Sequence, residues 1–296
     1  MNEKKGIAIV TGASSGIGCE LCRLFAQDGY PLLITARDEN ALNTLAEELK
    51  DSGATVMVIA MDLALPDAPP RLLDAAKGMS RPVDVLVNNA GFGTYGPFGT
   101  TDLPTTTAMM QVNMIALTQL CRLVLPSMIE RSRGRVLNVA STAAFQPGPL
   151  MAVYFATKAY VLHFSEALAN ELQGTGVTVT ALCPGPTETA FKSRAGIGET
   201  WLFSNRRLMS ARRVAALGYH ALMRGQRLAV PGLRNKLLVQ ATRFGPRRIV
   251  TGVVRLLQQP RDDRTAAGGL GLRTGHGEPT DRNLNTAASG TAIPQP

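Results

Sequence analysis

The chain has 296 residues, of which 45% are hydrophobic and 18% charged, enough apolar material for the core of one large α/β domain or two small ones. No stretch of about 18 apolar residues runs unbroken, and no signal-type apolar segment precedes the first strand, so we expect a cytoplasmic protein. Four cysteines are too few for a disulfide framework, and three scattered histidines lack neighbours at ligand spacing, so no metal site is predicted.

The formal net charge of +9 is unevenly distributed along the chain. Residues 1–191 contain 13 Lys and Arg against 17 Asp and Glu, whereas residues 192–296 contain 18 against 5. Nucleic-acid binding is not expected, because the arginines lack interleaved aromatic residues and no reader motif is present.

The N-terminal region predicts a strand, a glycine-rich turn and a helix, in that order. Residues 6–10 form a buried-strand pattern, the turn carries Gly12, Gly16 and Gly18, and helical periodicity follows to residue 28. Glycines admit close backbone approach and a helix N-terminus offers free N–H groups, which together suit a pyrophosphate. Cys19 and Cys22 have redox spacing, but they fall within this helix, where cysteine serves as a small apolar residue.

Strands and helices then alternate as far as residue 183. Strands are predicted at residues 32–35, 55–61, 83–88, 134–141 and 177–183, and helices at 39–52, 71–76, 105–131 and 154–172. This alternation is typical of an α/β, doubly wound parallel sheet of the Rossmann type, within a single domain of residues 1–260. Ligands bind beyond the carboxyl ends of such strands, so the polar and glycine residues there should share one edge: Gly12, Arg37, Asp62, Asn88 to Gly91, Ser141, Pro184 and Gly185.

A substrate lid and C-terminal helices are expected at about residues 186–260. The loop at 184–200 is rich in Gly, Thr and Ser, residues 206–225 and 234–259 show helical apolar spacing with many arginines, and residues 228–230 suit an edge strand. From residue 261 the chain has no aromatic residue, and we expect 261–296 to be a disordered tail.

Tyr154 and Lys158 lie four residues apart in a predicted helix, so they share one face. Lowering a tyrosine pKa from about 10 to about 7 requires roughly 4 kcal/mol. A charge about 4 Å away at an effective dielectric of about 20 supplies roughly that amount. The pair therefore suits proton transfer at an alcohol or carbonyl oxygen, although the pair alone is more simply explained as two residues of an amphipathic helix.

The motifs together resemble the classical short-chain dehydrogenase/reductase family. They comprise Thr11-Gly12-x-x-x-Gly16-x-Gly18, Asp62, Asn88-Asn89-Ala90-Gly91, Asn113, Ser141, Tyr154-x-x-x-Lys158 and Pro184-Gly185-x-x-x-Thr189. The resemblance covers about residues 5–190. The stretch at 91–98 and the basic C-terminal extension resemble the bacterial general oxidoreductases of the DltE type, a subgroup without a single substrate.

The resemblance implies a role for each of four catalytic residues. Tyr154 would be the general acid/base, Lys158 would lower its pKa and bind the nicotinamide ribose, Ser141 would hydrogen-bond the substrate oxygen, and Asn113 would hold a water in the proton relay. Structural alternatives stay open: Ser141 as the end of a strand, Asn113 as a buried polar group, Asp62 as a turn former and Thr189 as a helix cap.

The resemblance also implies the residues that contact a nicotinamide dinucleotide: Gly12, Ser14, Ser15, Gly16, Ile17, Gly18, Arg37, Asp62, Leu63, Asn89, Ala90, Gly91, Tyr154, Lys158, Pro184, Gly185, Thr187 and Thr189. Arg37, at the end of the second strand, suits the 2′-phosphate of NADP, whereas an acidic residue there would suit NAD. Asp38 follows directly, and either caps the next helix or pairs with Arg37. The sequence therefore favours NADP(H) over NAD(H).

The predicted function is NADP(H)-dependent interconversion of a carbonyl and a secondary alcohol. A 3-oxoacyl thioester reductase or a hydroxysteroid reductase is the alternative within enzymes, and a dinucleotide-binding scaffold or redox sensor is the alternative outside them.

Partners are predicted from the resemblance and from charge. Family analogy implies a homodimer or homotetramer packed through the helices at 105–131 and 154–172. Residues 192–261 hold 15 Lys and Arg and one acid, Glu199. This segment is either a solvated surface or a peripheral contact for an anionic membrane or an acidic acyl carrier.

Overall fold

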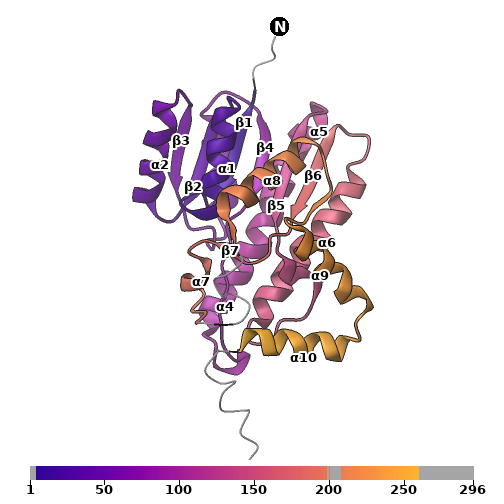
Figure 1. Ribbon diagram of the computed structural model, residues 1–296. Helices are drawn as coiled ribbons and strands as arrows, with labels where there is room; N and C mark the ends of the chain where they lie inside the picture. Colours follow the sequence, from indigo (N-terminus) through magenta and orange to yellow (C-terminus); the bar gives the residue numbers. More distant parts are fainter. Residues whose placement is uncertain (1–4, 199, 201–207, 260–296) are drawn as a thin grey trace, which may run out of the picture. The chain divides into compact units, whose positions relative to one another are not determined.

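Seven parallel strands form the central sheet, in the order β3, β2, β1, β4, β5, β6 and β9 (Figure 1). The computed structural model describes residues 5–198, 200 and 208–259, so the tail expected at 261–296 lies outside the described residues. The strands are β1 (Ile7–Thr11), β2 (Leu32–Ala36), β3 (Val56–Ala60), β4 (Val83–Asn88), β5 (Gly134–Val139), β6 (Val177–Leu182) and β9 (Leu228–Ala229).

Helices cover both faces of this sheet. The helices α1 (Gly16–Gln27), α2 (Glu39–Asp51) and α8 (Ala211–Met223) pack on one face, and α3 (Ala68–Lys77), α5 (Leu117–Glu130) and α6 (Ala152–Glu171) pack on the other. Along β1, Ile7 and Ile9 join the core on the α5 side, while Ala8 and Val10 join the core on the α1 side. Because successive strand residues point to opposite faces and both faces are buried, the strands are almost continuously apolar. The predicted fold class is confirmed.

The helix expected at 105–131 consists of three continuous segments: α4 (Leu103–Met110), a π-helical segment η2 (Gln111–Ala116) and α5. Among the described residues, the run Leu103–Glu130 alone is long and apolar enough to cross a membrane by length and composition. Here it packs against α3, β4 and β5, as a core helix does.

The C-terminal helices differ from the sequence pattern at one point. The spacing over 234–259 is divided between α9 (Leu233–Phe244) and α10 (Arg247–Gln258), with Gly245 and Pro246 between them. Proline cannot donate the backbone hydrogen bond that an uninterrupted helix needs. The expected edge strand is present as β9, which pairs with β6.

Cys19 and Cys22 lie on α1, and Cys22 belongs to the core. Burial raises the pKa of both thiols, which disfavours the thiolate that redox chemistry requires.

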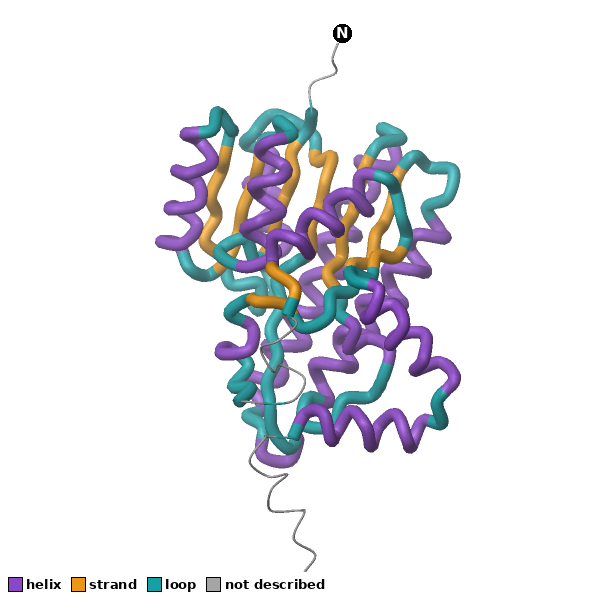
Figure 2. Tube along the Cα trace, in the orientation of Figure 1, coloured by secondary structure: helices purple, strands orange, loops and turns teal. Residues whose placement is uncertain are grey.

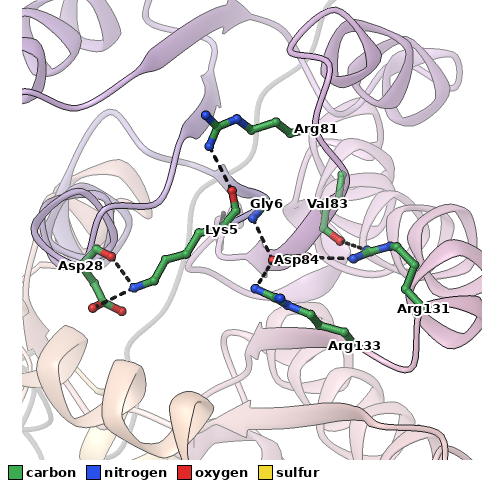
Figure 3. Close-up of polar contacts among 8 residues, drawn as sticks. All are labelled: Lys5, Gly6, Asp28, Arg81, Val83, Asp84, Arg131 and Arg133. Carbon is green, nitrogen blue, oxygen red and sulfur yellow. Dashed lines mark hydrogen bonds and ion pairs between the residues drawn. The ribbon is translucent and has the colours of Figure 1, made fainter. Parts of the chain in front are cut away.

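A buried carboxylate, Asp84, joins the amino ends of three central strands (Figure 3). Its oxygens accept from the Gly6 N–H at 2.8 Å, from Arg131 at 2.8 Å and from Arg133 at 2.9 Å. Arg131 also donates to the Val83 carbonyl at 2.7 Å. Asp84 is only 3% exposed, so these donors replace the water that its charge would otherwise require.

We expect Asp84→Asn to destabilise the fold by about 2 kcal/mol, because it removes the negative charge that pairs with Arg131 and Arg133 while keeping an acceptor for Gly6. In a domain of this size, that corresponds to a fall in Tm of roughly 4–8 °C. Asp74→Asn is the matched control, since its pair with Lys77 is exposed and should contribute under about 1 kcal/mol. Equal, small shifts in Tm for both variants would show that the Asp84 network adds no stability.

Candidate active site

The loops after the carboxyl ends of the strands enclose a cleft of about 760 Å³. Figure 2 shows these loops gathered on one side of the sheet, together with a short strand pair. This pair is β7 (Thr187–Glu188) with β8 (Met209–Ser210), and the short helix α7 (Phe191–Arg194) follows β7. The cleft is lined by residues that follow each of the strands β1 to β6.

The first wall of the cleft is the turn between β1 and α1. Gly12 and Gly16 have φ of 65° and 58°, the left-handed region that favours glycine. A Cβ on Gly12 would lie 2.8 Å from the Ala90 Cα, so a side chain there would collide with the opposite loop. The Ser15 side chain makes no capping bond to the start of α1, so the first N–H groups of that helix are left for another acceptor. This cradle fits a pyrophosphate.

The cradle is tied to the loop after β4 by Asn89. Its amide donates to the carbonyls of Thr11 and Gly12, each at 3.0 Å. The Thr11 hydroxyl in turn accepts from the backbone N–H groups of Asn89 and Ala90. A Cβ on Gly18 would lie 2.4 Å from the Asn89 amide nitrogen, so Gly18 makes room for this contact although it does not line the cleft.

The structure brings most of the predicted site residues together. The cleft lining includes Gly12, Ser14, Ser15, Gly16, Ile17, Arg37, Asp62, Leu63, Asn89, Ala90, Gly91, Ser141, Tyr154, Lys158, Pro184, Gly185, Thr187 and Thr189. Gly18 and Asn113 lie behind this lining.

Several of these residues also make the local contacts that the structural alternatives require. The Asp62 carboxylate accepts from the Ala64 N–H at 2.9 Å, which is a turn-forming bond. Thr189 accepts from the Phe191 N–H at 3.3 Å, at the start of α7. Asp38 accepts from the Ala41 N–H at 3.0 Å and therefore caps α2.

Tyr154 and Lys158 occupy the first turns of α6, with the Lys158 Nζ 5.8 Å from the centre of the Tyr154 ring. Lys158 is buried, and its ammonium donates to the Val139 carbonyl at the end of β5 at 2.8 Å. The Ser141 hydroxyl, two residues further on, accepts from the Ala143 N–H at 3.1 Å. The three side chains thus meet where β5 and α6 converge.

Burial has the largest effect on the pKa values of Tyr154 and Lys158. It raises the pKa of Tyr154 to about 12, while a hydrogen bond with Ser141 acts in the opposite direction. It lowers the pKa of Lys158 to about 8. The tyrosine environment therefore opposes the lowering expected from the sequence, because loss of water penalises the phenolate more than the neighbouring groups favour it.

Asn113 is carried by the π-helical segment η2 and is 1% exposed. Its amide group donates to the Phe92 carbonyl at 2.9 Å and to the Thr157 hydroxyl at 3.0 Å, and its oxygen accepts from the Phe92 N–H at 3.1 Å. π-Helical turns are frequent at functional sites. Here the turn lets one side chain hold the loop after β4 against the helix that carries Tyr154.

Two lining residues of α7 have no counterpart in the sequence motifs. The Phe191 ring lies 5.1 Å from that of Tyr154, and Arg194 donates to the Ser15 hydroxyl at 3.4 Å. They belong to the 184–200 loop, where no regular spacing fixes the position of a side chain. Their contacts with the start of α1 and with α6, which form only in the folded chain, identify them as site residues.

The chain belongs to the short chain dehydrogenase family of oxidoreductases, whose family model matches residues 6–199. A short chain dehydrogenase of Pseudocercospora fijiensis is 42% identical over 184 residues, which cover 62% of this chain and 60% of that protein. A ketoacyl reductase of Nostoc sp. is 33% identical over 177 residues, which cover 60% of this chain and 62% of that protein. The matched stretch thus spans less than two thirds of these two relatives.

Among solved structures, the fold is similar to that of a short-chain dehydrogenase from Sphingobium yanoikuyae in complex with NADPH. The two chains are 29% identical with a TM-score of 0.72, and the match covers 87% of this chain and 99% of that one.

Gly91→Ala tests the packing behind the lysine. The added Cβ would lie 3.0 Å from the Asn113 oxygen and 3.3 Å from the Lys158 Nζ, so we expect it to displace the ammonium. A displacement of this kind should lower kcat/KM roughly tenfold to hundredfold. Gly99→Ala is the control, because its Cβ would enter open space. Steady-state kinetics in which both variants match the wild type would rule out a tightly fixed Lys158.

Proposed function

We propose that this protein interconverts a carbonyl and a secondary alcohol by hydride transfer with NADP(H), using Tyr154 as general acid/base. The observation that carries the proposal is the pair of half-buried Tyr154 and buried Lys158, which lines the same cleft as the glycine cradle. A bound nicotinamide supplies or accepts the hydride, and its oxidised form adds a positive charge to the cleft. A scaffold or redox sensor would need the cradle but not the pair of Tyr154 and Lys158.

The pKa of Tyr154 sets the easier direction of proton transfer. With a pKa of about 12, the phenol is protonated at neutral pH and is ready to donate to the oxygen of a carbonyl that is being reduced. In the oxidation direction the phenolate must form near neutrality, a difference of about five units or roughly 7 kcal/mol. This difference remains with Lys158 in place, although the pKa of about 8 keeps most of the lysine charged at pH 7.

The surrounding residues orient the reaction. Ser141 would hydrogen-bond the substrate oxygen. Two observations support this role: Ser141 lines the cleft, and its hydrogen bond with Tyr154 opposes the rise in the pKa of that tyrosine. Asn113 acts by holding the loop of Phe92 against Thr157, one residue before Lys158.

The substrate is an apolar carbonyl compound or its alcohol. Next to Tyr154 the buried cluster consists of Ala143, Met151, Phe155, Ala195 and Ile197, with Phe191 packed against it. The members of this group that line the cleft are Ala143, Met151, Phe155 and Phe191. Such a wall accommodates alkyl or ring carbons by the hydrophobic effect and leaves the oxygen for Ser141 and Tyr154. A 3-oxoacyl thioester meets this requirement, and the name of the Nostoc relative favours it over a hydroxysteroid.

We also propose that the active form is a homodimer or homotetramer. The outer faces of the Leu103–Glu130 run and α6 expose Ile115, Leu123, Ile129 and Tyr160, which a second copy would cover.

Tyr154→Phe should reduce turnover by roughly 10²–10⁴-fold, because it removes the transferable proton. NADPH affinity should stay within a few-fold, since the ring and its packing are retained. Tyr160→Phe is the matched control on the same helix, where the hydroxyl bonds Thr118 on the outer surface. NADPH oxidation over a panel of aldehydes, ketones and 3-oxoacyl thioesters measures turnover, and wild-type rates in the Tyr154 variant would refute the mechanism.

Arg37→Asp should shift the preference from NADP toward NAD, because it replaces a partner of the 2′-phosphate with an acceptor for a ribose hydroxyl. Arg37 lines the cleft and is exposed, so the exchange should leave the fold intact. Arg194→Gln is the comparison: beside Ser15 it should weaken both cofactors alike. The measurement is the ratio of kcat/KM with NADP to kcat/KM with NAD. An unchanged ratio in the Arg37 variant would show that another residue sets the cofactor preference.

A further inference from the structure

Helices α9 and α10 each hold to the rest of the fold by one face. They lie on the side of the sheet where β7 and α7 also lie (Figure 1). In α9 the inward residues are Asn235, which packs against Gly185, and the buried Val239. In α10, Val254 packs against the cluster beside Tyr154, and the Gln258 carbonyl accepts from the Tyr95 hydroxyl at 2.6 Å.

The outward faces of these helices are apolar rather than polar. Phe244 is 87% exposed, Leu233 74% and Ile249 62%. The spacing shows that this is a face: in α9 Leu233, Leu237 and Phe244 are four and seven residues apart, and in α10 Ile249, Val253 and Leu257 are each four apart. An ordinary surface helix turns its apolar stripe toward the core, whereas both helices keep large apolar side chains on the solvent side.

Six exposed basic residues accompany this stripe: Arg234, Lys236, Arg243, Arg247, Arg248 and Arg255. The sequence from 208 to 259 contains no aspartate or glutamate, so the segment does not neutralise its own charge. We call the six apolar residues and these six cations the basic apolar face. Its charge is complementary to an anionic partner.

We propose that the basic apolar face docks on the surface of an anionic lipid bilayer. A leaflet offers phosphates to the cations and acyl chains to the apolar residues at the same time. An acidic acyl carrier would pair with the arginines but leave the apolar stripe without a matching layer. A second copy of the chain would bring six more cations against the first six, which is repulsive.

Co-sedimentation of the full chain with vesicles tests the proposal. We expect binding to phosphatidylcholine vesicles that contain phosphatidylserine, loss of that binding at high salt, and little binding to phosphatidylcholine alone. Each cation removed should lower the partition coefficient about fivefold, equivalent to about 1 kcal/mol. A triple change should therefore cost roughly a hundredfold. The variant is Arg243→Gln, Arg247→Gln and Arg248→Gln together.

A second triple variant has the same net charge but leaves the basic apolar face unchanged: Arg122→Gln, Arg212→Gln and Arg224→Gln. It should bind as the wild type does, since these arginines lie on α5 and α8 and in the turn after α8. Phe244→Ser should lower binding about tenfold, while Leu217→Ser, at an exposed position of α8, should not. All four variants change exposed side chains, and an unchanged Tm confirms that each is folded.

Three results would overturn the proposal. They are absence of binding to phosphatidylserine vesicles at low salt, equal loss in both triple variants, and concentration-dependent self-association that Phe244→Ser abolishes. The last result would identify a second copy as the occupant. Docking does not require turnover, so Tyr154→Phe should bind vesicles like the wild type. Failure of the catalytic mechanism is therefore distinguishable from failure of docking.

Discussion

The tie between the ends of β1 and β4 is the contact on which the cleft depends. The side-chain amide of Asn89 donates hydrogen bonds to two backbone carbonyls of the glycine turn. The Thr11 hydroxyl accepts two hydrogen bonds from backbone N–H groups of the loop after β4. Buried backbone groups need such partners, and this arrangement brings two loops close enough that only hydrogen fits at Gly12 and Gly18. The cradle, the start of α1 and the position of Gly91 follow from that closeness.

The same crowding governs the proton chemistry. Lys158 is withdrawn from water and anchored on the Val139 carbonyl, and the surroundings of Tyr154 favour the neutral phenol. In the mechanism that we propose, Tyr154 keeps its proton until a substrate oxygen accepts it, and further positive charge in the cleft would favour the phenolate. Desolvation and the hydrogen bond with Ser141 thus act in opposite directions on the pKa of one hydroxyl, and both depend on the packing of β5 against α6.

Charged side chains gather at both ends of the sheet, but in two different arrangements. At the amino ends of the strands, two arginines converge on one buried carboxylate and tie β4 to the start of β5. On the cleft side, cations gather on α9 and α10 without acids in the same segment. The first arrangement is satisfied within the chain, whereas the second is directed outward. The helix α10 can therefore pack Val254 against the cluster beside Tyr154 and still expose apolar side chains on its opposite face.

The order of strands and helices, the parallel sheet and the glycine turn could be predicted from the sequence, because apolar periodicity and glycine spacing are local signals that do not depend on long-range contacts. Helical spacing also pointed to Tyr154 and Lys158, and the family resemblance added Ser141 and Asn113. Three features could be seen only in the folded chain: Asp38 caps α2, Phe191 and Arg194 reach the cleft, and burial outweighs the Ser141 hydrogen bond at the Tyr154 hydroxyl. These features depend on the distances between segments that are far apart in the chain and on the exclusion of water. A local sequence pattern specifies neither.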